Sequence, residues 1–490
     1  MEFVEDRLRD NAKRYADKTA VYDEQGEISF RLLWEEACGF ALYLRSLKLP
    51  SGARIMVRAK AAIPTVIAYY GIHLAGLVNV PCEATAGPEA LASIAAETGA
   101  SLVVSDIELS AGFSVLPYDD VRQLALAHFS SAAVFDDAGP ETLCDILFTT
   151  GTTGKSKGVM ISRRALAAST ENLIKGSDIT DDTVYLIPVP INHANGIRKC
   201  YSTISAGGTV VLVEGLSNIR KFYAALEKNK ANFLLLPPSA VRMLLMLSAK
   251  MLAKYADQIK LVHTSAAPFP EADKKRLCEL LPHTRLVFAY GSSEVANVSM
   301  FDYSNYPDRI CCVGSLNIHS KVRITDADGN EIHSSKEQQG IVELGGDAVM
   351  SGYYNEPELT ASVLKNGWVR TSDLGYFDED GFLYILGRAD DVINVGGLKI
   401  SPTEVENVVM QFSGIAECAC FGADDPMTGK KPVLIIVPER GVTVDPVVLG
   451  AFLEMRMEAY KIPKKIQTVQ EIPKTSNGKI DRKTIVKIYG

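Results

Sequence analysis

Short apolar runs that alternate with helical segments place the strongest constraint on how this chain folds. From residue 183 onward, strand-like runs occupy 184–187, 209–213, 233–236, 261–263 and 286–289. Segments with the apolar spacing of a helix lie between them, at 218–228, 239–256 and 270–281. In the first third of the chain, helical spacing over 4–16 and 30–46 alternates with strand-like runs at 53–58 and 101–105. Such alternation predicts βαβ units, and hence an α/β fold with parallel sheets.

The pattern changes in the second half of the chain. Strands and turns dominate over 320–388, where two Asp-x-Asp-Gly segments are typical of turns. After Arg388 a smaller unit begins, in which a helix that starts at Pro402 precedes strands and a second helix. The sequence therefore predicts an α/β protein with a large N-terminal domain of mixed βαβ sheets and a β-rich subdomain, followed by a small α+β domain. The expected limits are 1–388 for the large domain, 389–391 for a hinge and 392–490 for the small C-terminal domain.

The chain is acidic, with a formal net charge of −8 over 490 residues. This charge argues against a nonspecific nucleic-acid binder and against binding to an anionic membrane. The nine cysteines lack the pair spacing of a zinc site, and the N-terminus lacks the apolar core of a signal peptide. No apolar run is long enough to span a membrane. We expect a cytoplasmic protein with reduced thiols, as a monomer or a homodimer.

One segment has the composition of an anion-binding loop. Residues 149–158 read Thr-Thr-Gly-Thr-Thr-Gly-Lys-Ser-Lys-Gly and lie between two apolar runs. Glycine lets backbone N–H groups approach a phosphate, while hydroxyls and lysines add donors and charge. The Gly-Lys-Ser at 154–156 imitates the end of a Walker A loop, but that motif needs glycine where Thr149 stands and a helix directly after the loop. We therefore predict a phosphate-binding loop between two strands.

Several motifs, in the same order, resemble the acyl-adenylate-forming (AMP-binding) superfamily, which includes acyl-CoA synthetases, adenylation domains of peptide synthetases and beetle luciferases. The loop resembles the family form S/T-S/T-G-S/T-T-G-x-P-K-G, with Ser156 in place of proline. Tyr-Gly-Ser-Ser-Glu at 290–294 resembles Y-G-x-T-E, and Thr-Ser-Asp at 371–373 resembles T-G-D. Pro-Lys-Thr-Ser-Asn-Gly-Lys at 473–479 resembles P-x-T-x-x-G-K. The resemblance covers nearly the whole chain.

The resemblance implies a site for ATP and Mg²⁺ on the large domain. Tyr290 would stack on adenine, Ser293 would bind the α-phosphate, and Asp373 would accept hydrogen bonds from both ribose hydroxyls. Glu294 and a loop hydroxyl, Thr149, would hold Mg²⁺, which prefers oxygen ligands. The expected nucleotide-binding residues are Thr149, Thr150, Gly151, Thr152, Thr153, Lys157, Ala267, Ala289, Tyr290, Ser293, Asp373 and Arg388.

The resemblance also implies that the small domain is mobile and carries part of the site. Lys479 would be the catalytic lysine of adenylation. Gly396 and Gly397 belong to a loop that resembles the lining of the pantetheine tunnel in thioester-forming relatives, and glycines leave room there for a thin chain. Asn394 stands where many members have lysine. Asp390 would be the hinge residue about which the small domain rotates between two half-reactions.

The acid-binding pocket is predicted from the segment 188–196, which resembles the segment with a gate histidine in CoA ligases. The expected pocket residues are His193, Asn195, Gly196 and Ser292. Small side chains at Ala267, Ala289 and Ser292 favour an apolar slot for an aryl or medium-chain aliphatic acid. Arg198 would either bind a polar substituent of the acid or face solvent.

The expected reaction is attack of a carboxylate on the α-phosphorus of ATP with release of pyrophosphate, followed by transfer of the acyl group to a thiol. Charge neutralisation by Mg²⁺, Lys479 and the loop donors would carry the first step. CoA is the expected acceptor. The alternative is a stand-alone enzyme that loads a carrier protein, because both acceptors present a pantetheine thiol. A luciferase-like oxygenase and a catalytically silent nucleotide-binding protein are rarer alternatives. The residues that argue against the silent one are Lys157, Glu294, Asp373 and Lys479.

Overall fold

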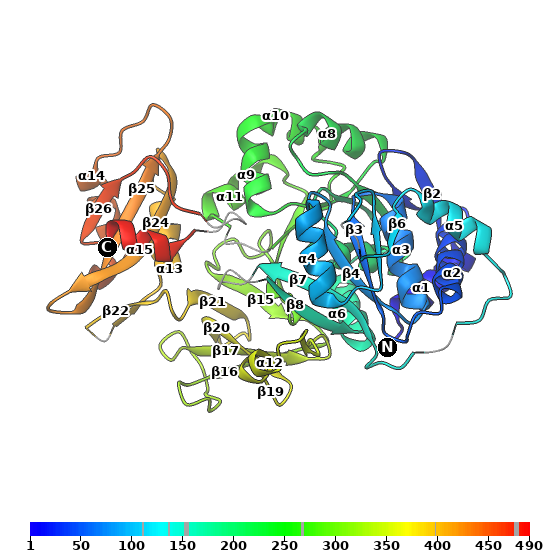
Figure 1. The fold of residues 1–490 in the computed structure, drawn as a ribbon. Coiled ribbons are helices and arrows are strands. Elements are labelled where there is room, and N and C mark those ends of the chain that lie inside the picture. Colours follow the sequence, from blue (N-terminus) through cyan, green and yellow to red (C-terminus); the bar gives the residue numbers. More distant parts are fainter. Residues whose placement is uncertain (110–111, 136–137, 151–155, 266–268, 397, 475–479) are drawn as a thin grey trace.

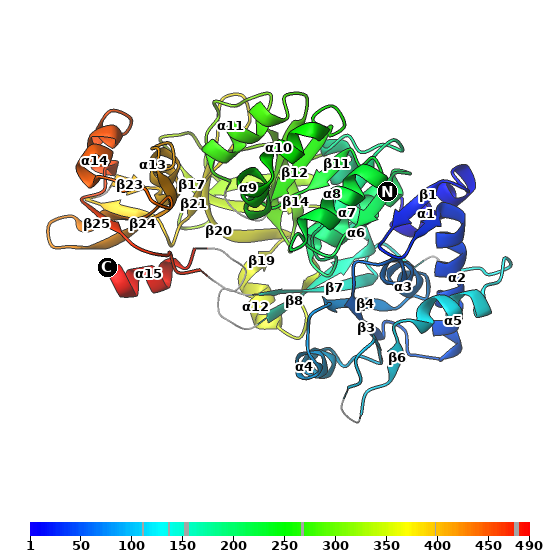
Figure 2. The ribbon, with the colours of Figure 1, turned by 90° about the horizontal axis from the view of Figure 1, so that it is seen from above.

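Three β-sheets with covering helices make up the computed structural model, which describes residues 1–109, 112–135, 138–150, 156–265, 269–396, 398–474 and 480–490. The smallest sheet and its own helices lie at one end of the molecule, away from the two larger sheets (Figure 1, Figure 2). This arrangement confirms a large mixed α/β part and a small C-terminal α+β part.

Seven strands form the first sheet, in the order β18 (Gly352–Tyr353), β8 (Ser156–Ser162), β7 (Leu143–Thr150), β4 (Val78–Glu83), β3 (Arg54–Ala59), β5 (Leu102–Ser105) and β6 (Val115–Pro117). Its members from β7 to β6 pair in parallel, whereas β8 and β18 are antiparallel to their neighbours. On β3, Ile55 and Val57 face one apolar cluster and Met56 faces another. Both faces of the sheet are therefore covered, as is usual for parallel strands.

Fourteen strands form the second sheet. Its order is β16 (Ser320–Thr325), β17 (Gly340–Gly346), β20 (Trp368–Phe377), β21 (Leu383–Arg388), β15 (Cys312–Leu316), β14 (Ala296–Asp302), β13 (Arg285–Ser292), β12 (Leu261–Ser265), β11 (Phe233–Leu235), β9 (Val184–Ile187), β10 (Thr209–Leu212), β1 (Thr19–Tyr22) and β2 (Glu27–Ser29), with β19 (Leu364–Lys365) beside β20. Strands β9 to β13 pair in parallel, which confirms the βαβ prediction. Beyond β13 the pairing is antiparallel, which confirms the β-rich region.

Twelve α-helices belong to this large part among the described residues. They are α1 (Val4–Arg14), α2 (Phe30–Ser46), α3 (Ile63–Leu74), α4 (Pro88–Thr98), α5 (Asp120–His128), α6 (Arg163–Gly176), α7 (Ala194–Ser205), α8 (Ile219–Lys228), α9 (Pro238–Leu247), α10 (Ala249–Leu252), α11 (Glu271–Leu280) and α12 (Pro357–Val363). The single helix expected over 239–256 is divided at Ser248. The Ser248 hydroxyl bonds to the Leu244 carbonyl and to the Tyr223 hydroxyl, and such side-chain bonds compete with continuation of a helix.

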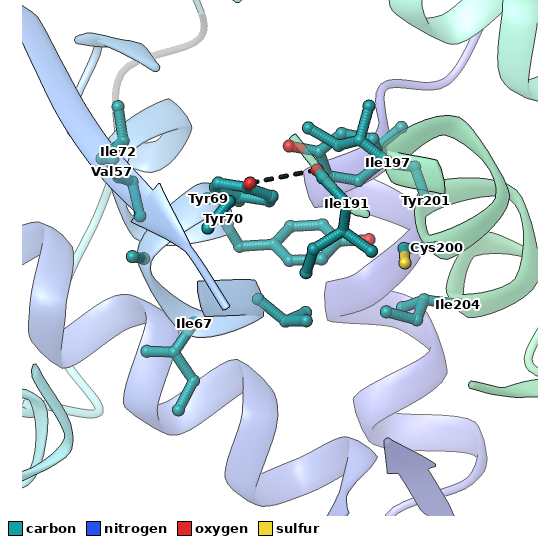
Figure 3. Packing of buried hydrophobic residues seen from close by; sticks show 14 of the residues in the cluster. Val57, Ile67, Tyr69, Tyr70, Ile72, Ile191, Ile197, Cys200, Tyr201 and Ile204 are labelled. Atoms are coloured by element: carbon teal, nitrogen blue, oxygen red, sulfur yellow. Dashed lines mark hydrogen bonds between the residues drawn. The ribbon is translucent and has the colours of Figure 1, made fainter. Parts of the chain in front are cut away.

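The largest apolar cluster lies between the two large sheets, and α3 and α7 meet within it. Figure 3 shows Tyr69 and Tyr70 of α3 beside Ile197 and Tyr201 of α7. The Tyr69 hydroxyl donates to the carbonyl of Ile191 at 3.1 Å, and the rings of Tyr70 and Tyr201 meet edge to face with centroids 5.3 Å apart. This packing fixes α7 in the interior, at the place where the acid pocket is expected.

The C-terminal sheet has the order β23 (Leu398–Ile400), β22 (Ile393–Val395), β25 (Gly429–Pro438) and β24 (Ile415–Asp425), with β26 (Lys465–Thr468) beside β25. One face packs on α13 (Pro402–Val409) and α14 (Pro446–Glu454), and the other packs on α15 (Arg482–Tyr489). Arg242 of α9 donates to the carbonyl of Ala416 at 2.9 Å and so joins the large and small parts. Within the described ranges, no helix is both long and apolar enough to cross a membrane.

Candidate active site

The predicted phosphate-binding loop is held at its base by a strand pair. Strands β7 and β8 run antiparallel with Thr149 opposite Lys157, which confirms that the loop joins two strands. The Lys157 ammonium lies 5.6 Å from the centroid of the Tyr353 ring, within cation–π range. The strand pair therefore places a positive charge beside the loop. Outside the described residues lie Gly151, Thr152 and Thr153.

A carboxylate and a phenol connect this loop to the motif at 290–294. Glu294 follows β13, and its Oε1 accepts a hydrogen bond of 2.8 Å from the Tyr353 hydroxyl. The turn from β13 to β14 is tight, because a Cβ on Gly291 would lie 1.7 Å from the carbonyl oxygen of Ala296. Burial raises the pKa of Tyr353, and the Glu294 carboxylate raises this pKa further, so the phenol keeps its proton and remains a donor.

These contacts bring the two predicted magnesium ligands into one group. Thr149 pairs with Lys157, Lys157 lies over the Tyr353 ring, and Tyr353 is bonded to Glu294. A hydroxyl and a carboxylate are hard oxygen ligands of the kind that Mg²⁺ shares with phosphates and water. The half-buried Glu294 receives its described side-chain hydrogen bond on Oε1, which leaves the Oε2 side of the carboxylate for a cation. The residues present therefore fit Mg²⁺.

A second group forms where β13, β20 and β21 meet. The Tyr290 hydroxyl donates to Oδ2 of Asp373 at 2.5 Å, and Asp373 lies opposite Arg388 in the β20–β21 pair. The backbone N–H of Asp373 donates to the Thr371 hydroxyl at 2.9 Å, which fixes the backbone at this position. Burial and then the Asp373 carboxylate raise the pKa of Tyr290. The structure thus brings together Tyr290, predicted to stack on adenine, Asp373, predicted to bind the ribose, and Arg388, predicted to contact the nucleotide.

The predicted acid pocket lies at the N-terminus of α7. His193 precedes the helix with a side chain that is 48% exposed, and its Nε2 lies 3.6 Å from Oε1 of Glu83. Gly196 stands in the first turn, where a Cβ would lie 2.4 Å from the Pro190 carbonyl oxygen. The glycine is needed for this close approach of two backbone segments. His193 lies at the surface end of the segment, and its role as a pocket residue stays a prediction.

Arg198 connects this helix to the turn that precedes Glu294. Its guanidinium donates to the carbonyl oxygens of Ser292 at 3.3 Å and Ser293 at 2.9 Å. Arg198 is buried, so the alternative in which it faces solvent is wrong. The predicted pocket residue Ser292 is exposed, Ser293 is half-buried, and Ala289 is buried in β13, whereas Ala267 lies outside the described residues.

The structure describes only some of the residues that were predicted to function in the small part. Gly396 follows β22 with a φ of 57°, and its N–H donates to the Thr428 carbonyl at 3.0 Å. Asp390 is exposed and lies 3.7 Å from the Arg388 guanidinium. The hinge at 389–391 stays a prediction. Outside the described residues lie Gly397 and the expected catalytic Lys479.

An arginine close to Lys479 in sequence anchors the C-terminal helix. Arg482 opens α15 and forms two hydrogen bonds with the Glu406 carboxylate, at 2.7 and 2.9 Å. Its Nε lies 3.5 Å from Oδ2 of Asp391, within the expected hinge. Arg482 therefore links the segment after Lys479 to the start of the small part. Neither Arg482 nor Tyr353 was predicted from the sequence, in which Gly-Tyr-Tyr at 352–354 is the local signal for Tyr353.

The fold and the site define an α/β nucleotide-binding enzyme with a large two-sheet part and a small α+β part. The AMP-binding enzyme family model matches residues 8–354, and the AMP-binding enzyme C-terminal domain model matches residues 404–479. The chain therefore belongs to the AMP-binding enzyme family, and it is a ligase of the AMP-forming acid–CoA ligase type.

Relatives of known activity and solved structures agree with this assignment. The indoleacetate–CoA ligase of Aromatoleum aromaticum is 32% identical over 386 residues, which are 77% of this chain and 73% of the relative. The feruloyl-CoA synthase of an Amycolatopsis species is 28% identical over 85% of this chain and 84% of its own. The ATP-bound structure of MatB from Rhodopseudomonas palustris superposes with a TM-score of 0.86 at 26% identity and covers 99% of this chain and 98% of MatB.

Proposed function

We propose that this chain activates an aryl or medium-chain aliphatic carboxylic acid as its acyl-AMP, with release of pyrophosphate, and then transfers the acyl group to the thiol of CoA. The observation that carries the proposal is the connected group Thr149, Lys157, Tyr353 and Glu294 beside the Tyr290–Asp373 pair. The first group has the charges and oxygen ligands to bind magnesium triphosphate, and the second has the acceptor for a ribose diol. Loading of a carrier protein is the alternative.

In this proposal the protein positions the two substrates and neutralises the charge of the phosphates, and no acid–base dyad takes part. Mg²⁺, when bound by Glu294 and Thr149, supplies charge neutralisation at the phosphates. Lys157 adds a fixed positive charge at the base of the loop, and Asp373 orients the ribose. Lys479 is assigned to the α-phosphate during adenylation, and the loop of Gly396 and Gly397 to the thiol that attacks afterwards. Asp390 is assigned to the hinge between the two steps.

The test is ATP–pyrophosphate exchange with a panel of aryl and aliphatic acids, followed by product analysis with CoA and with a holo carrier protein. We expect exchange with at least one acid and an acyl-CoA product. A thioester formed only on the carrier protein would favour the alternative acceptor. Failure of exchange with every acid would contradict adenylation itself and favour a silent nucleotide-binding protein.

The Asp373→Asn substitution is expected to raise KM for ATP by about 10- to 100-fold, because a charge-assisted hydrogen bond is worth about 1.5–3 kcal/mol. The measurement is the ATP dependence of exchange, made in parallel with 2′-deoxyATP. The wild-type enzyme should prefer ATP, and the variant should lose most of that preference. An unchanged preference for ATP would contradict the assignment of Asp373 to the ribose.

The Tyr353→Phe substitution is expected to lower kcat/KM for adenylation by about 10-fold, since a group that orients a metal ligand typically contributes about 10- to 100-fold. The change removes only the hydroxyl that donates to Glu294. The adjacent Tyr354 offers a matched control, because its hydroxyl donates to the Thr98 carbonyl at 3.0 Å instead. Equal losses in Tyr353→Phe and Tyr354→Phe would contradict a specific role for Tyr353. A titration of Mg²⁺ separates a metal effect from a general one.

A further inference from the structure

Two buried cations stand side by side on α7. Arg198 is 4% exposed and Lys199 is 1% exposed. The hydrogen bonds of Arg198 go to the backbone carbonyls of Ser292 and Ser293. The Lys199 ammonium donates to the side-chain oxygen of Asn195 at 2.8 Å. Each cation thus bonds to neutral oxygens, and neither forms an ion pair within the described part of the chain.

Lys199 lies on the side of α7 that faces away from the apolar core. Ile197, Tyr201 and Ile204 form the apolar side and pack in the cluster around α3 (Figure 3). With 3.6 residues per turn, Asn195 and Lys199 lie together on the opposite side. Asn195 is a predicted pocket residue and is half-buried, so it stands between the Lys199 ammonium and the surface end of the segment. Lys199 therefore lies one helical turn inward from the predicted acid pocket.

The surroundings of Lys199 do not balance its charge. Arg198 on the same helix and His263 on β12 are the titratable groups whose charges interact with it. Burial and then the Arg198 charge lower the pKa of Lys199 to about 7, and burial and then the Lys199 charge lower the pKa of His263. Nδ1 of His263 shares a hydrogen bond of 3.3 Å with the Ser177 hydroxyl. The buried Nε2 of His263 has no hydrogen-bond partner among the described residues. Buried polar groups without partners and a buried ammonium without an anion are both costly.

We propose that the acid activated by this enzyme carries a second carboxylate, and that Lys199 and Asn195 bind this second group while the first carboxylate reacts. The inference rests on the proposed function, and it narrows the substrate class to dicarboxylic acids. A carboxylate beside the ammonium would supply the charge that the protein lacks and would accept bonds from Lys199 and the Asn195 amide. Arg198 keeps its place as the support of the turn before Glu294.

The first experiment compares dicarboxylic acids with their monomethyl esters in ATP–pyrophosphate exchange. The panel contains the straight-chain diacids from malonic to suberic acid, the three benzenedicarboxylic acids, and the monomethyl ester of each. Each pair shares its skeleton and its reacting carboxylate, and differs in the charge of the second group and by one methyl group. We expect at least one diacid to exceed its ester by about 100-fold in kcat/KM, the usual size of a buried charge pair.

Variants of the two residues then assign that preference. Lys199→Met should reduce the diacid-to-ester ratio by about 100-fold, while Lys175→Met, an exposed lysine on α6, should leave both rates unchanged. Asn195→Asp places a carboxylate of the protein beside the ammonium, where it competes with the substrate, and should also lower the ratio. The melting temperature of Lys199→Met should not fall, because the substitution removes a buried charge without a counter-ion. If Lys199→Met does not fold, Asn195→Asp carries the test.

The outcomes separate this inference from the function on which it rests. Exchange with monocarboxylic acids or esters but not with diacids would overturn the inference and leave adenylation standing. A diacid preference that survives both Lys199→Met and Asn195→Asp would also overturn it. Exchange with no acid of either kind would contradict the proposed function and the inference together.

Discussion

Replacement of Lys479 by alanine is expected to lower the rate of ATP–pyrophosphate exchange by about 1,000-fold, in the range found when one preorganised donor to a transition state is removed. The carboxylate and the triphosphate repel each other, so the step depends on positive charge near the α-phosphate. If the small part rotates after adenylation, Lys479 is no longer needed when the thiol attacks. The rate of thiolysis of a supplied acyl-adenylate should therefore change little.

A nearby lysine supplies the control for this experiment. Lys474 lies in the same segment, and its ammonium forms a 2.7 Å ion pair with Glu417 on the surface of the small part. Lys474→Ala should leave both half-reactions close to the wild-type rates, because exposed ion pairs contribute little. The two rates are measured separately, by exchange and by CoA-dependent release of AMP from the acyl-adenylate. Equal loss of both half-reactions in Lys479→Ala would contradict the assigned role.

The parts of the fold that were predictable are those in which local pattern and tertiary environment agree. The run 184–187 is apolar at every position because β9 is covered on both faces, and its predicted bounds match the strand. The helix expected over 30–46 also matches α2, because Ser29 caps it through a bond to the Leu32 N–H. Ser248 shows the limit of this reasoning, since its hydroxyl bonds decide a break that apolar spacing does not encode.

The candidate site was predictable where a motif is contiguous and was missed where distant segments meet. Tyr290 and Asp373 were assigned from separate motifs, and the structure joins them through one hydrogen bond. Tyr353 was missed because its contact with Glu294 depends on the pairing of the two-residue strand β18 with β8, which leaves almost no pattern in the sequence. The burial of Arg198 could likewise not be predicted from the spacing of apolar residues in the sequence, because a cation on a helix usually faces water.

A buried ion network beneath β7 is another feature without a sequence signal. His73 of α3 lies between two carboxylates, with Nδ1 2.8 Å from Oε1 of Glu5 and Nε2 3.3 Å from Oδ1 of Asp145. Arg163 donates to Glu5 at 3.0 Å, and Asn79 donates to Asp145 at 2.8 Å. The side chains of the three central residues are at most 4% exposed. The network joins α1, α3 and α6 to the strand that leads into the phosphate-binding loop.

The charges of this network predict how stability depends on pH. Burial alone would lower the pKa of His73, but the Asp145 and Glu5 carboxylates outweigh it and raise the pKa from 6.5 to about 9. Burial alone would raise the pKa of Glu5, but His73 and Arg163 outweigh it and lower the pKa from 4.5 to about 2. The histidine therefore contributes fully below pH 6.5, and its contribution is lost as the pH rises towards 9. The Glu5 contribution is present above pH 4.5 and is lost as the pH falls towards 2.

The His73→Phe substitution is expected to lower the free energy of unfolding by about 3–5 kcal/mol at pH 6, because it leaves buried carboxylates without their shared cation. Phenylalanine keeps an aromatic ring beside Tyr201, whose ring centroid lies 5.7 Å from that of His73, so the change isolates the charge from most of the packing. Denaturant unfolding between pH 5 and 9.5 is the measurement, and the decline in the free energy of unfolding above pH 6.5 should be much weaker in the variant.

His319→Phe is the matched control, because His319 also lies between two carboxylates, Glu171 at 2.6 Å and Asp347 at 3.3 Å, but is 20% exposed. It should cost only about 0–1 kcal/mol, as more exposed ion pairs do. Equal costs in the two variants, or an unchanged alkaline decline in His73→Phe, would show that the network does not carry this share of the stability.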